Sequence, residues 1–393
     1  MPHNMTRIGR RAFVLSLGAS AGAGMFAMAS KSRRGSDAQE DQDRLTRDKP
    51  RDFSVNGDAS LRERAAAKGL LYGAAAREQV LTSNPDFASA FARECGILVP
   101  ENELKWQGIR PRFDRFNFKR ADELADFARD HDMLYRGHTL VWHKALPAWF
   151  KEKVNSKNAE KILTDHIKTV AKHYAGKMHS WDVVNEAIEV ADKRPDGLRK
   201  GPWLNLLGPD YIDIAFRTAA EADPKALLVY NENQLEHYNK PRNEAKRTQV
   251  LKLLERLKSK GVPVQALGMQ SHLGSKPLGS QGKKLRQFVK EVADLGLKIM
   301  VTEMDVSEKL PWDVAARDRQ VAAIYEEYLS IVLDEPATIA VMTWGLSDRY
   351  TWISKRIQRQ DGASVRPLPL DAQLERKLAW NAIARAFDHA PQR

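Results

Sequence analysis

Two glutamates in this sequence stand in surroundings that suggest acid–base chemistry. Glu186 follows Asn185 at the end of one apolar run, and Glu303 precedes Asp305 at the end of another. Hydrolysis of a glycosidic bond with retention of configuration needs two carboxyl groups about 5–5.5 Å apart, one as nucleophile and one as proton donor. These glutamates could form such a pair if the fold brings them together. The residues alone do not say which glutamate plays which part.

The two roles dictate what should surround the pair. The proton donor must hold its proton near neutral pH, through desolvation or a nearby negative charge, whereas the nucleophile must stay ionised. His272 could donate a hydrogen bond to Glu303 and keep it charged, and Asp305 could orient that imidazole. The amide of Asn185 could bond the 2-hydroxyl of a sugar, a contact that strengthens as the transition state becomes oxocarbenium-like.

Both glutamates belong to a regular alternation of short apolar runs and longer helical patterns, which is typical of parallel α/β folds. Eight strands are predicted, at 70–74, 97–100, 134–138, 180–184, 226–230, 264–269, 298–302 and 339–343. Helices are predicted between them, and a last one at 374–387. Eight strand–helix pairs in one run indicate a single (β/α)8 TIM barrel, since a doubly wound sheet normally has fewer strands.

Polar and aromatic residues follow seven of these eight strands. In a barrel the carboxyl ends of the strands share one rim, where active sites lie. A sugar chain calls for this mixture, because aromatic faces cover its C–H surfaces while carboxylates, amides and imidazoles bond its hydroxyls. The segments are 101–106, 138–143, 185–186, 231–233, 270–272, 303–305 and 344–352.

Composition argues against several other classes of protein. The 393 residues are 42% apolar and 29% charged, which is ordinary for a globular chain and unlike collagen, a coiled coil or a disordered protein. The single cysteine, Cys95, leaves no intramolecular disulfide and no cysteine-rich zinc module, so no such metal site is expected. The net charge of +12 is dispersed, which indicates a solvated basic surface and no nucleic-acid groove. A monomer is expected.

Residues 1–29 predict a signal for the twin-arginine export machinery. An arginine pair at 10–11 precedes an apolar, Gly/Ala-rich stretch that ends in Ala-Met-Ala at 27–29, small residues that a signal peptidase reads. The stretch is near the minimum length of a membrane span but contains glycines and serines, so removal is expected and a stable anchor is not. Residues 30–57 are expected to be a charged flexible linker, and 58–393 the (β/α)8 catalytic domain. The product would be periplasmic or secreted.

Several motifs, in their order and spacing, resemble those of the family 10 glycoside hydrolases, the endo-β-1,4-xylanases. Trp181–Glu186 and Val301–Asp305 are similar to that family's acid/base and nucleophile motifs. Further similar segments are 101–106, 138–143, 268–273, 343–352 and 366–371. The resemblance covers roughly residues 60–388 and implies a (β/α)8 barrel that hydrolyses β-1,4-xylosidic bonds in xylan without a cofactor.

The resemblance also implies a role for each matching residue. Glu186 would be the acid/base and Glu303 the nucleophile. The sugar two places from the cleavage point on the non-reducing side would contact Glu101, Asn102 and Lys105. The sugar under attack would be surrounded by His138, Trp142, Asn185, Gln270 and His272. Trp344 and Trp352 would form the apolar floor and wall around this sugar. The hydroxymethyl group of a glucose unit would collide with them.

Three places depart from that family's pattern. Lys144 and Ala145 stand, near the cleaved sugar, where small polar residues or Gln more often follow Trp-His. Gly201-Pro202 replaces a more usual Ser on the leaving-group side, and 231–233 matches loosely, which leaves a substrate contact by Asn231 weakly supported.

Two alternative functions would use the same cleft. One is hydrolysis of short xylo-oligosaccharides or other β-1,4-glycans. The other is polysaccharide binding without turnover, which the presence of both glutamates argues against. Outside the cleft, His166 and His173 are expected on an exposed helix face, and Asp348 is expected to pair with Arg349. The tryptophans expected in packing are Trp149, Trp203, Trp312 and Trp380.

Overall fold

The computed structural model describes residues 51–236, 241–309 and 313–393. The predicted export signal, residues 30–50 of the predicted linker and Trp312 lie outside these ranges. The compact unit begins at Phe53 and runs to Arg393. The side chain of Phe53 is buried and its carbonyl accepts a hydrogen bond from Asn381 at 3.0 Å. The compact unit therefore includes the last few residues assigned to the linker.

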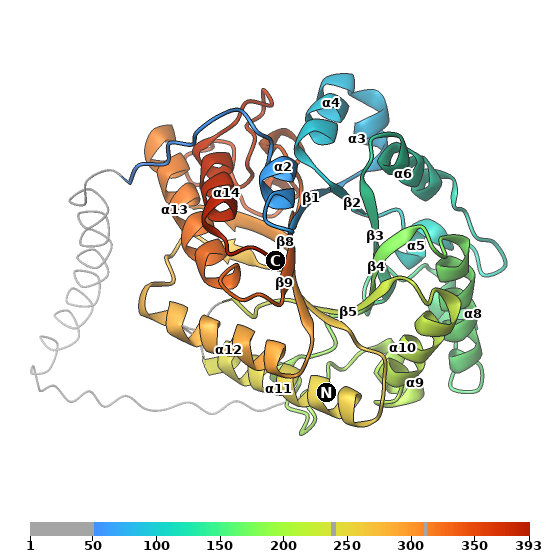
Figure 1. Ribbon diagram of the computed structural model, residues 1–393. Coiled ribbons are helices and arrows are strands. Elements are labelled where there is room, and N and C mark those ends of the chain that lie inside the picture. Colours follow the sequence, from blue (N-terminus) through green and yellow to red (C-terminus); the bar gives the residue numbers. More distant parts are fainter. Residues whose placement is uncertain (1–50, 237–240, 310–312) are drawn as a thin grey trace, which may run out of the picture. The chain divides into compact units, whose positions relative to one another are not determined.

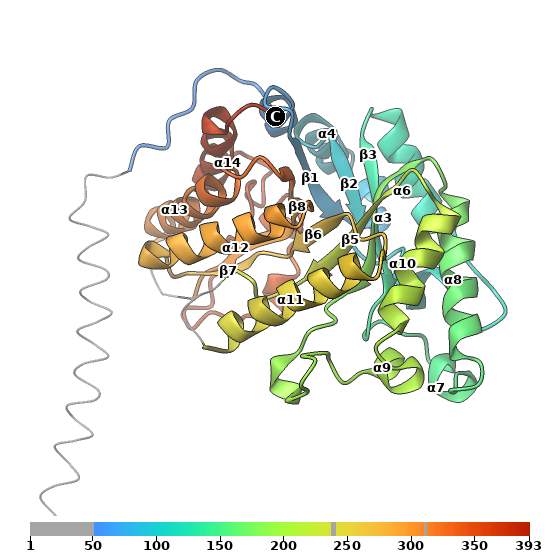
Figure 2. The same ribbon diagram turned by 60° about the horizontal axis from the view of Figure 1, so that its bottom comes forward.

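Eight parallel strands close into a barrel, seen nearly end-on in Figure 1 and from the side in Figure 2. They are β1 (Leu71–Ala76), β2 (Ile97–Pro100), β3 (Leu134–Val141), β4 (Met178–Asn185), β5 (Leu227–Glu232), β6 (Ala266–Met269), β8 (Lys298–Ser307) and β9 (Thr338–Thr343). Sequence neighbours pair in order, β6 pairs with β8, and β9 pairs with β1 to close the sheet. The predicted (β/α)8 barrel is confirmed. A short strand, β7 (His272–Gly274), was not predicted and pairs with the end of β8.

Helices form the outer layer around these strands (Figure 1). They are α2 (Leu61–Ala66), α3 (Glu78–Ser83), α4 (Pro85–Glu94), α5 (Trp106–Ile109), α6 (Lys119–Asp130), α7 (Trp149–Lys153), α8 (Ala159–His173), α9 (Pro202–Leu207), α10 (Tyr211–Ala222), α11 (Pro241–Ser259), α12 (Gly282–Asp294), α13 (Val314–Val332) and α14 (Leu378–His389). In α12 the buried Leu285, Phe288, Val289 and Val292 recur at helical spacing, which turns one stripe towards the barrel. Gly296, with φ +72°, follows the end of that helix.

Packing inside the barrel leaves only its carboxyl rim open to chemistry. The strands fill the interior with alanine, β-branched and methionine side chains, namely Ala75, Ile97, Val99, Val229, Ala266, Met300, Ala340 and Met342. Trp344 packs against this cluster at the end of β9. Such a filled barrel is a core and not a channel, so reacting groups must gather where the strands end.

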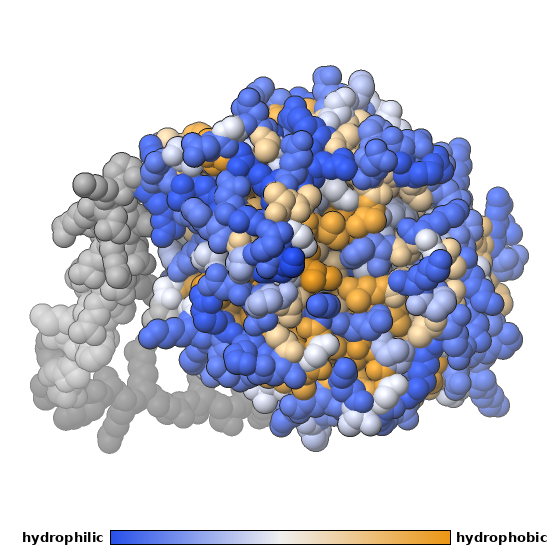
Figure 3. Space-filling view, viewed as in Figure 1, coloured by the Kyte–Doolittle hydropathy of each residue, from blue (hydrophilic) through white to orange (hydrophobic). Residues whose placement is uncertain are grey.

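The outer surface is mainly hydrophilic. Figure 3 shows the face of Figure 1 covered largely by hydrophilic residues, with apolar residues gathered near the middle of the view. The exposed large apolar side chains among the described residues are Phe113, Leu134 and Val314. Within the described ranges, no helix combines the length and apolarity that a bilayer crossing requires.

Candidate active site

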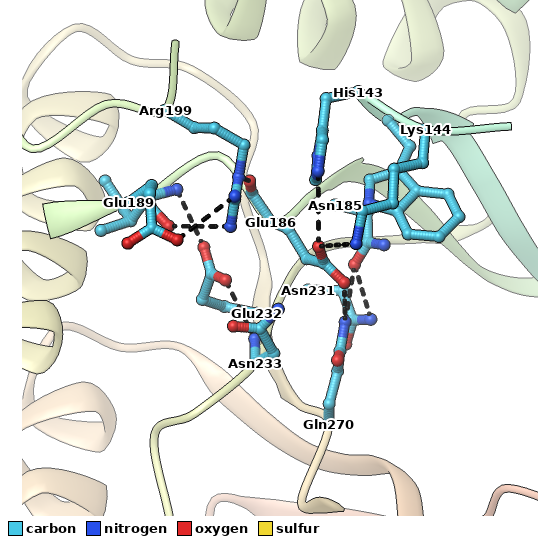
Figure 4. Close-up of polar contacts among 12 residues, drawn as sticks. His143, Lys144, Asn185, Glu186, Glu189, Arg199, Asn231, Glu232, Asn233 and Gln270 are labelled. Carbon is cyan, nitrogen blue, oxygen red and sulfur yellow. Dashed lines mark hydrogen bonds and ion pairs between the residues drawn. The ribbon is translucent and has the colours of Figure 1, made fainter. Parts of the chain in front are cut away.

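Glu186 directly follows the last residue of β4. Its φ of +56° puts the backbone in the left-handed region, where non-glycine residues are uncommon. The Glu186 amide donates to the carbonyl of Asn231 at 2.9 Å, and its own carbonyl accepts from Arg199 Nε at 2.8 Å. These bonds hold this backbone from both sides, and the carboxyl group is buried (Figure 4).

The two carboxyl oxygens of Glu186 have different surroundings (Figure 4). Oε1 accepts a hydrogen bond from Gln270 Nε2 at 3.1 Å. Oε2 is buried and receives no hydrogen bond from the described residues. The basic side chains nearest to it are His143, whose Nε2 lies at 3.9 Å, and Lys144, whose Nζ lies at 4.0 Å. Oε2 is therefore the oxygen that is free to carry and deliver a proton.

Glu303 lies within β8, on the other side of the rim. Its Oε1 accepts from Asn231 Nδ2 at 2.8 Å, and its Oε2 lies 3.3 Å from His272 Nε2. His272 Nδ1 lies 3.0 Å from Asp305 Oδ2, to which Trp352 Nε1 also donates at 2.8 Å. His272 therefore lies between Glu303 and Asp305, as expected, with a hydrogen bond to Glu303 and an ion-pair contact with Asp305.

Amide groups link the two glutamates in one hydrogen-bonded chain. Gln270 Nε2, which bonds Glu186, also lies 3.2 Å from Asn185 Oδ1. Asn231 Nδ2, which bonds Glu303, donates to the same Asn185 oxygen at 3.0 Å. Glu186 and Glu303, far apart in sequence, therefore share a hydrogen-bonded network built from β8 and the ends of β4, β5 and β6.

Asn231 is the centre of that network. It is completely buried, and its Oδ1 accepts from Thr302 Oγ1 at 2.7 Å, which fixes which way the amide points. Because Asn231 makes all these bonds and is not exposed, it holds Asn185 and Glu303 in place. Asn231 therefore positions these two residues and does not contact the substrate, as the loose motif match had suggested.

The surroundings of Glu303 keep it ionised. Burial raises its pKa, but the hydrogen bond from His272 and the positive charges of His138, His272 and Lys105 lower it to about 2. For His272 the balance is reversed: burial lowers its pKa, while Asp305 and Glu303 raise it well above the usual value. An imidazolium thus faces a carboxylate at neutral pH.

Glu186 differs from the sequence-based expectation. Burial and the charge of Glu303 raise its pKa, as a proton donor requires. The hydrogen bond from Gln270 and the charge of Lys144 outweigh them, so the pKa of Glu186 lies below the usual value. Burial, with help from Arg199, lowers the pKa of His143 to about 4, so His143 is neutral at neutral pH and Lys144 is the leading charge on Glu186 there.

The residues expected to bind the more distant sugar lie together after β2. Asn102 Nδ2 donates to Glu101 Oε1 at 3.3 Å, and Lys105 Nζ donates to Asn102 Oδ1 at 3.3 Å. Lys105 Nζ lies 5.3 Å from the ring centre of Trp142 and 5.6 Å from that of Trp344. This polar group is therefore continuous with the aromatic walls.

The aromatic side chains reach the same place from β3 and β9. His138 packs edge-on against Trp344, with ring centres 5.2 Å apart, and lies 6.3 Å from the ring of Trp142. Trp352 lies 5.1 Å from the ring of His272. Every residue expected around the sugars thus belongs to one connected cluster.

Sequence reasoning missed the groups that hold His138. Its Nδ1 lies 2.8 Å from Asp182 Oδ2, and the other Asp182 oxygen accepts from the buried guanidinium of Arg136. In register, Arg136 faces Ser180 and His138 faces Asp182. Polar residues at every second position of two buried strands were the available signal, because such residues share one face of the sheet.

Closely packed backbone fixes His138 from the other side. A Cβ added to Gly137 would lie 2.0 Å from Cε3 of the Trp181 ring. Only glycine allows β3 to approach that ring so closely, so the neighbouring Arg136 and His138 cannot shift along the strand.

Replacing Asp182 with Ala should destabilise the fold severely, because it leaves the guanidinium of Arg136, which has no exposure, without its counter-charge. We expect a loss of about 3–5 kcal/mol in the free energy of unfolding, measured by urea titration. The control is Asp126→Ala, which breaks the exposed pair with Arg129 and should cost less than about 1 kcal/mol. Equal losses in both variants would contradict the structural account.

Two predictions outside the cleft are wrong. His166 is fully buried and stacked on Trp106, with ring centres 3.6 Å apart, because it lies on the apolar stripe of α8. Asp348 pairs with Lys377 at 2.7 Å instead of Arg349, since the chain end folds back over this loop. Trp149, Trp203 and Trp380 are buried in packing as expected.

No group of three or more possible metal ligands occurs in the described part of the chain.

A closed (β/α)8 barrel whose rim joins two buried carboxyl groups through shared amides is built like a glycoside hydrolase. The family model of glycosyl hydrolase family 10 matches residues 60–386. The chain belongs to glycosyl hydrolase family 10, as its motifs indicated, and it is therefore a glycoside hydrolase.

Named relatives agree with that membership. Endo-1,4-beta-xylanase B of Thermotoga neapolitana is 38% identical over 262 residues, which are 66% of this chain and 72% of that protein. Endo-1,4-beta-xylanase B of Paenibacillus barcinonensis is 34% identical over 334 residues, which are 81% of this chain and 96% of that protein. The crystal structure of xylanase 10B from Thermotoga petrophila RKU-1 in complex with xylobiose has a TM-score of 0.77 at 35% identity, covering 85% of this chain and 99% of that one.

Proposed function

We propose that this protein hydrolyses internal β-1,4 bonds of xylan with retention of configuration, Glu303 acting as nucleophile and Glu186 as acid/base. The observation that carries the proposal is the hydrogen-bonded chain that joins the two carboxyl groups through Gln270, Asn185 and Asn231. The names of the relatives support xylan as the substrate.

The first step needs the two glutamates in opposite protonation states. A Glu303 oxygen attacks the anomeric carbon while Glu186 gives its proton to the departing glycosidic oxygen. The bond between that oxygen and the anomeric carbon breaks, and the sugar is left as an ester of Glu303. The low pKa of Glu303 keeps its carboxylate ready to attack.

The second step reverses the part of Glu186. Its carboxylate takes a proton from water as that water attacks the anomeric carbon. The ester bond breaks, Glu303 leaves as a carboxylate, and Glu186 is protonated again. Asn185 accepts hydrogen bonds from the two amides that bond the glutamates, and from this place its own amide could bond the 2-hydroxyl during both steps.

The aromatic walls favour xylose as the sugar under attack. Trp344 is largely buried and packs on the barrel core, so it cannot move aside. The indole of Trp352 is fixed by its hydrogen bond to Asp305. A rigid wall here would collide with the hydroxymethyl group of glucose, which xylose lacks.

A polysaccharide panel with product sizing tests the proposal. We expect rapid loss of viscosity and a ladder of oligosaccharides from xylan, with little product from carboxymethylcellulose or xylobiose. Proton NMR of fresh products should show the β-anomer first. First-formed α-anomers would refute the retaining mechanism, and a preference for carboxymethylcellulose or xylobiose would favour the alternative hydrolases. Binding without turnover would leave a polysaccharide-binding protein.

Replacing His272 with Gln should move the acid limb of the kcat/KM profile to higher pH. The neutral amide cannot supply the imidazolium charge that helps hold the pKa of Glu303 at about 2, so Glu303 would take up its proton at a higher pH. The measurement is kcat/KM on xylo-oligosaccharides over the acid range. The matched control is His173→Gln, whose imidazole pairs with Asp122 outside the site. An unmoved acid limb in the His272 variant would contradict this role.

We also propose that residues 1–29 direct export through the twin-arginine machinery and that the enzyme meets xylan as a monomer outside the cytoplasm. The arginine pair at 10–11 and the small residues at 27–29 support this. The single cysteine supports it too, because a chain without disulfides can fold before export.

A further inference from the structure

Lys144 occupies an unusual place beside the buried carboxyl group of Glu186. Its Nζ lies 4.0 Å from Glu186 Oε2, the oxygen that receives no hydrogen bond from the described residues. The same ammonium lies 5.5 Å from the ring centre of Trp142, which supports its position. The Lys144 side chain is 59% exposed, so its amino end is in contact with solvent.

The other groups around Glu186 do not supply an equivalent positive charge. His143 contacts the same oxygen but is neutral at neutral pH, because its pKa is about 4. Arg199 bonds the backbone carbonyl of Glu186 rather than its carboxyl group. Glu303, on β8, opposes the ionisation of Glu186 by its negative charge. Lys105 interacts electrostatically more strongly with Glu303 and Glu101 than with Glu186. Figure 4 shows His143 and Lys144 approaching from one side and Gln270 from the other.

We propose that Lys144 is a positioning residue that sets the pH range of the enzyme, by favouring the ionised form of Glu186 over the protonated form. The inference rests on the proposed role of Glu186 as acid/base. An ammonium 4.0 Å from a carboxylate stabilises the charge, and it has no such effect on the neutral acid. The lowered pKa of Glu186, to which the Lys144 charge contributes, agrees with this geometry.

The two chemical steps respond to Lys144 in opposite ways. The first step uses protonated Glu186, so the lysine confines rapid cleavage of xylan to the acid side of the range. The second step uses ionised Glu186 as the base, so the lysine favours hydrolysis of the covalent intermediate. Lys144 therefore shifts the balance of the reaction towards the second step.

Removing the charge should move the basic limb of the kcat/KM profile upwards. For Lys144→Gln acting on xylo-oligosaccharides, we expect that limb to rise by about half to one pH unit. For a 2,4-dinitrophenyl β-xylobioside, whose leaving group departs without a proton, the basic limb should not move. High salt should bring the parent closer to the variant, because an exposed charge is screened.

Matched variants separate this effect from net charge and from structure. Lys144→Arg keeps the charge and should superimpose on the parent, as should Lys151→Gln, which removes an exposed lysine from α7. Lys144→Ser provides a second neutral variant. The inference is overturned if neither neutral variant moves the basic limb, or if Lys151→Gln or the dinitrophenyl substrate shows the same shift. A parent that does not cleave xylan would instead refute the proposed function.

Discussion

Replacing Glu303 with Ala is expected to lower kcat on xylan by roughly 10⁴-fold or more, because no covalent intermediate can form. Binding of xylo-oligosaccharides should survive, since Glu101, Asn102 and Lys105 are untouched. Steady-state rates and isothermal titration calorimetry measure the two effects separately. The combination of lost turnover and retained affinity is specific to removal of a reacting group.

The control for that variant is Glu244→Gln, which removes an exposed carboxylate that pairs with Lys284 on the outer helices. It should keep the parent rate. A Glu303→Ala enzyme that matches the parent would rule out this residue as nucleophile. A variant that loses binding together with turnover would show that the substitution had disturbed the site as a whole.

Replacing Glu186 with Ala should separate the two chemical steps by substrate. On xylan we expect a loss of roughly 10²–10⁴-fold, because the leaving group receives no proton. On a 2,4-dinitrophenyl β-xylobioside the first step should remain fast and the second should be slow, since the general base is also missing. A burst of dinitrophenolate and a protein carrying one added glycosyl group, seen by mass spectrometry, would follow.

Azide gives this variant a second test. A small anion can enter the space left by the carboxylate and attack the glycosyl ester from the same side as water. Turnover of the aryl substrate should therefore rise with azide, and the product should be a β-glycosyl azide. Equal losses on xylan and on the activated substrate, with no effect of azide, would refute the acid/base role of Glu186.

The fold was predictable because each buried strand carries its own signal. Apolar runs at 97–100 and 339–343 match β2 and β9 to within one residue. The short helices α2, α3, α5, α7 and α9 and the strand β7 were not predicted. Each has between three and six residues, which is too short to show a hydrophobic period.

The site was predictable as a set of residues but not as a network. The predicted strand ends indicated which side chains would lie together. In the structure, Glu186 and Glu303 are joined by hydrogen bonds, as that pattern required. The central place of Asn231 depends on how the ends of three strands face one another, which no single segment encodes. The pKa of Glu186 likewise depends on Lys144 and Gln270, which come from separate loops.

The burial of His166 was predictable from the helical period of the sequence. Its neighbours Ile162, Leu163, Ile167 and Val170 are buried along one stripe of α8. Position 166 falls on that stripe by the same helical period, so the pattern predicts burial whatever the residue type.

The left-handed backbone at Glu186 has a consequence for any search for heat-resistant forms of this enzyme. A residue with a Cβ costs about 1–2 kcal/mol in that conformation, and glycine or asparagine would relieve much of that cost. Selection for thermal endurance alone would therefore tend to enrich inert chains altered at this one position. Only a screen that demands turnover would retain the glutamate. At this position thermal stability and catalysis therefore favour different residues.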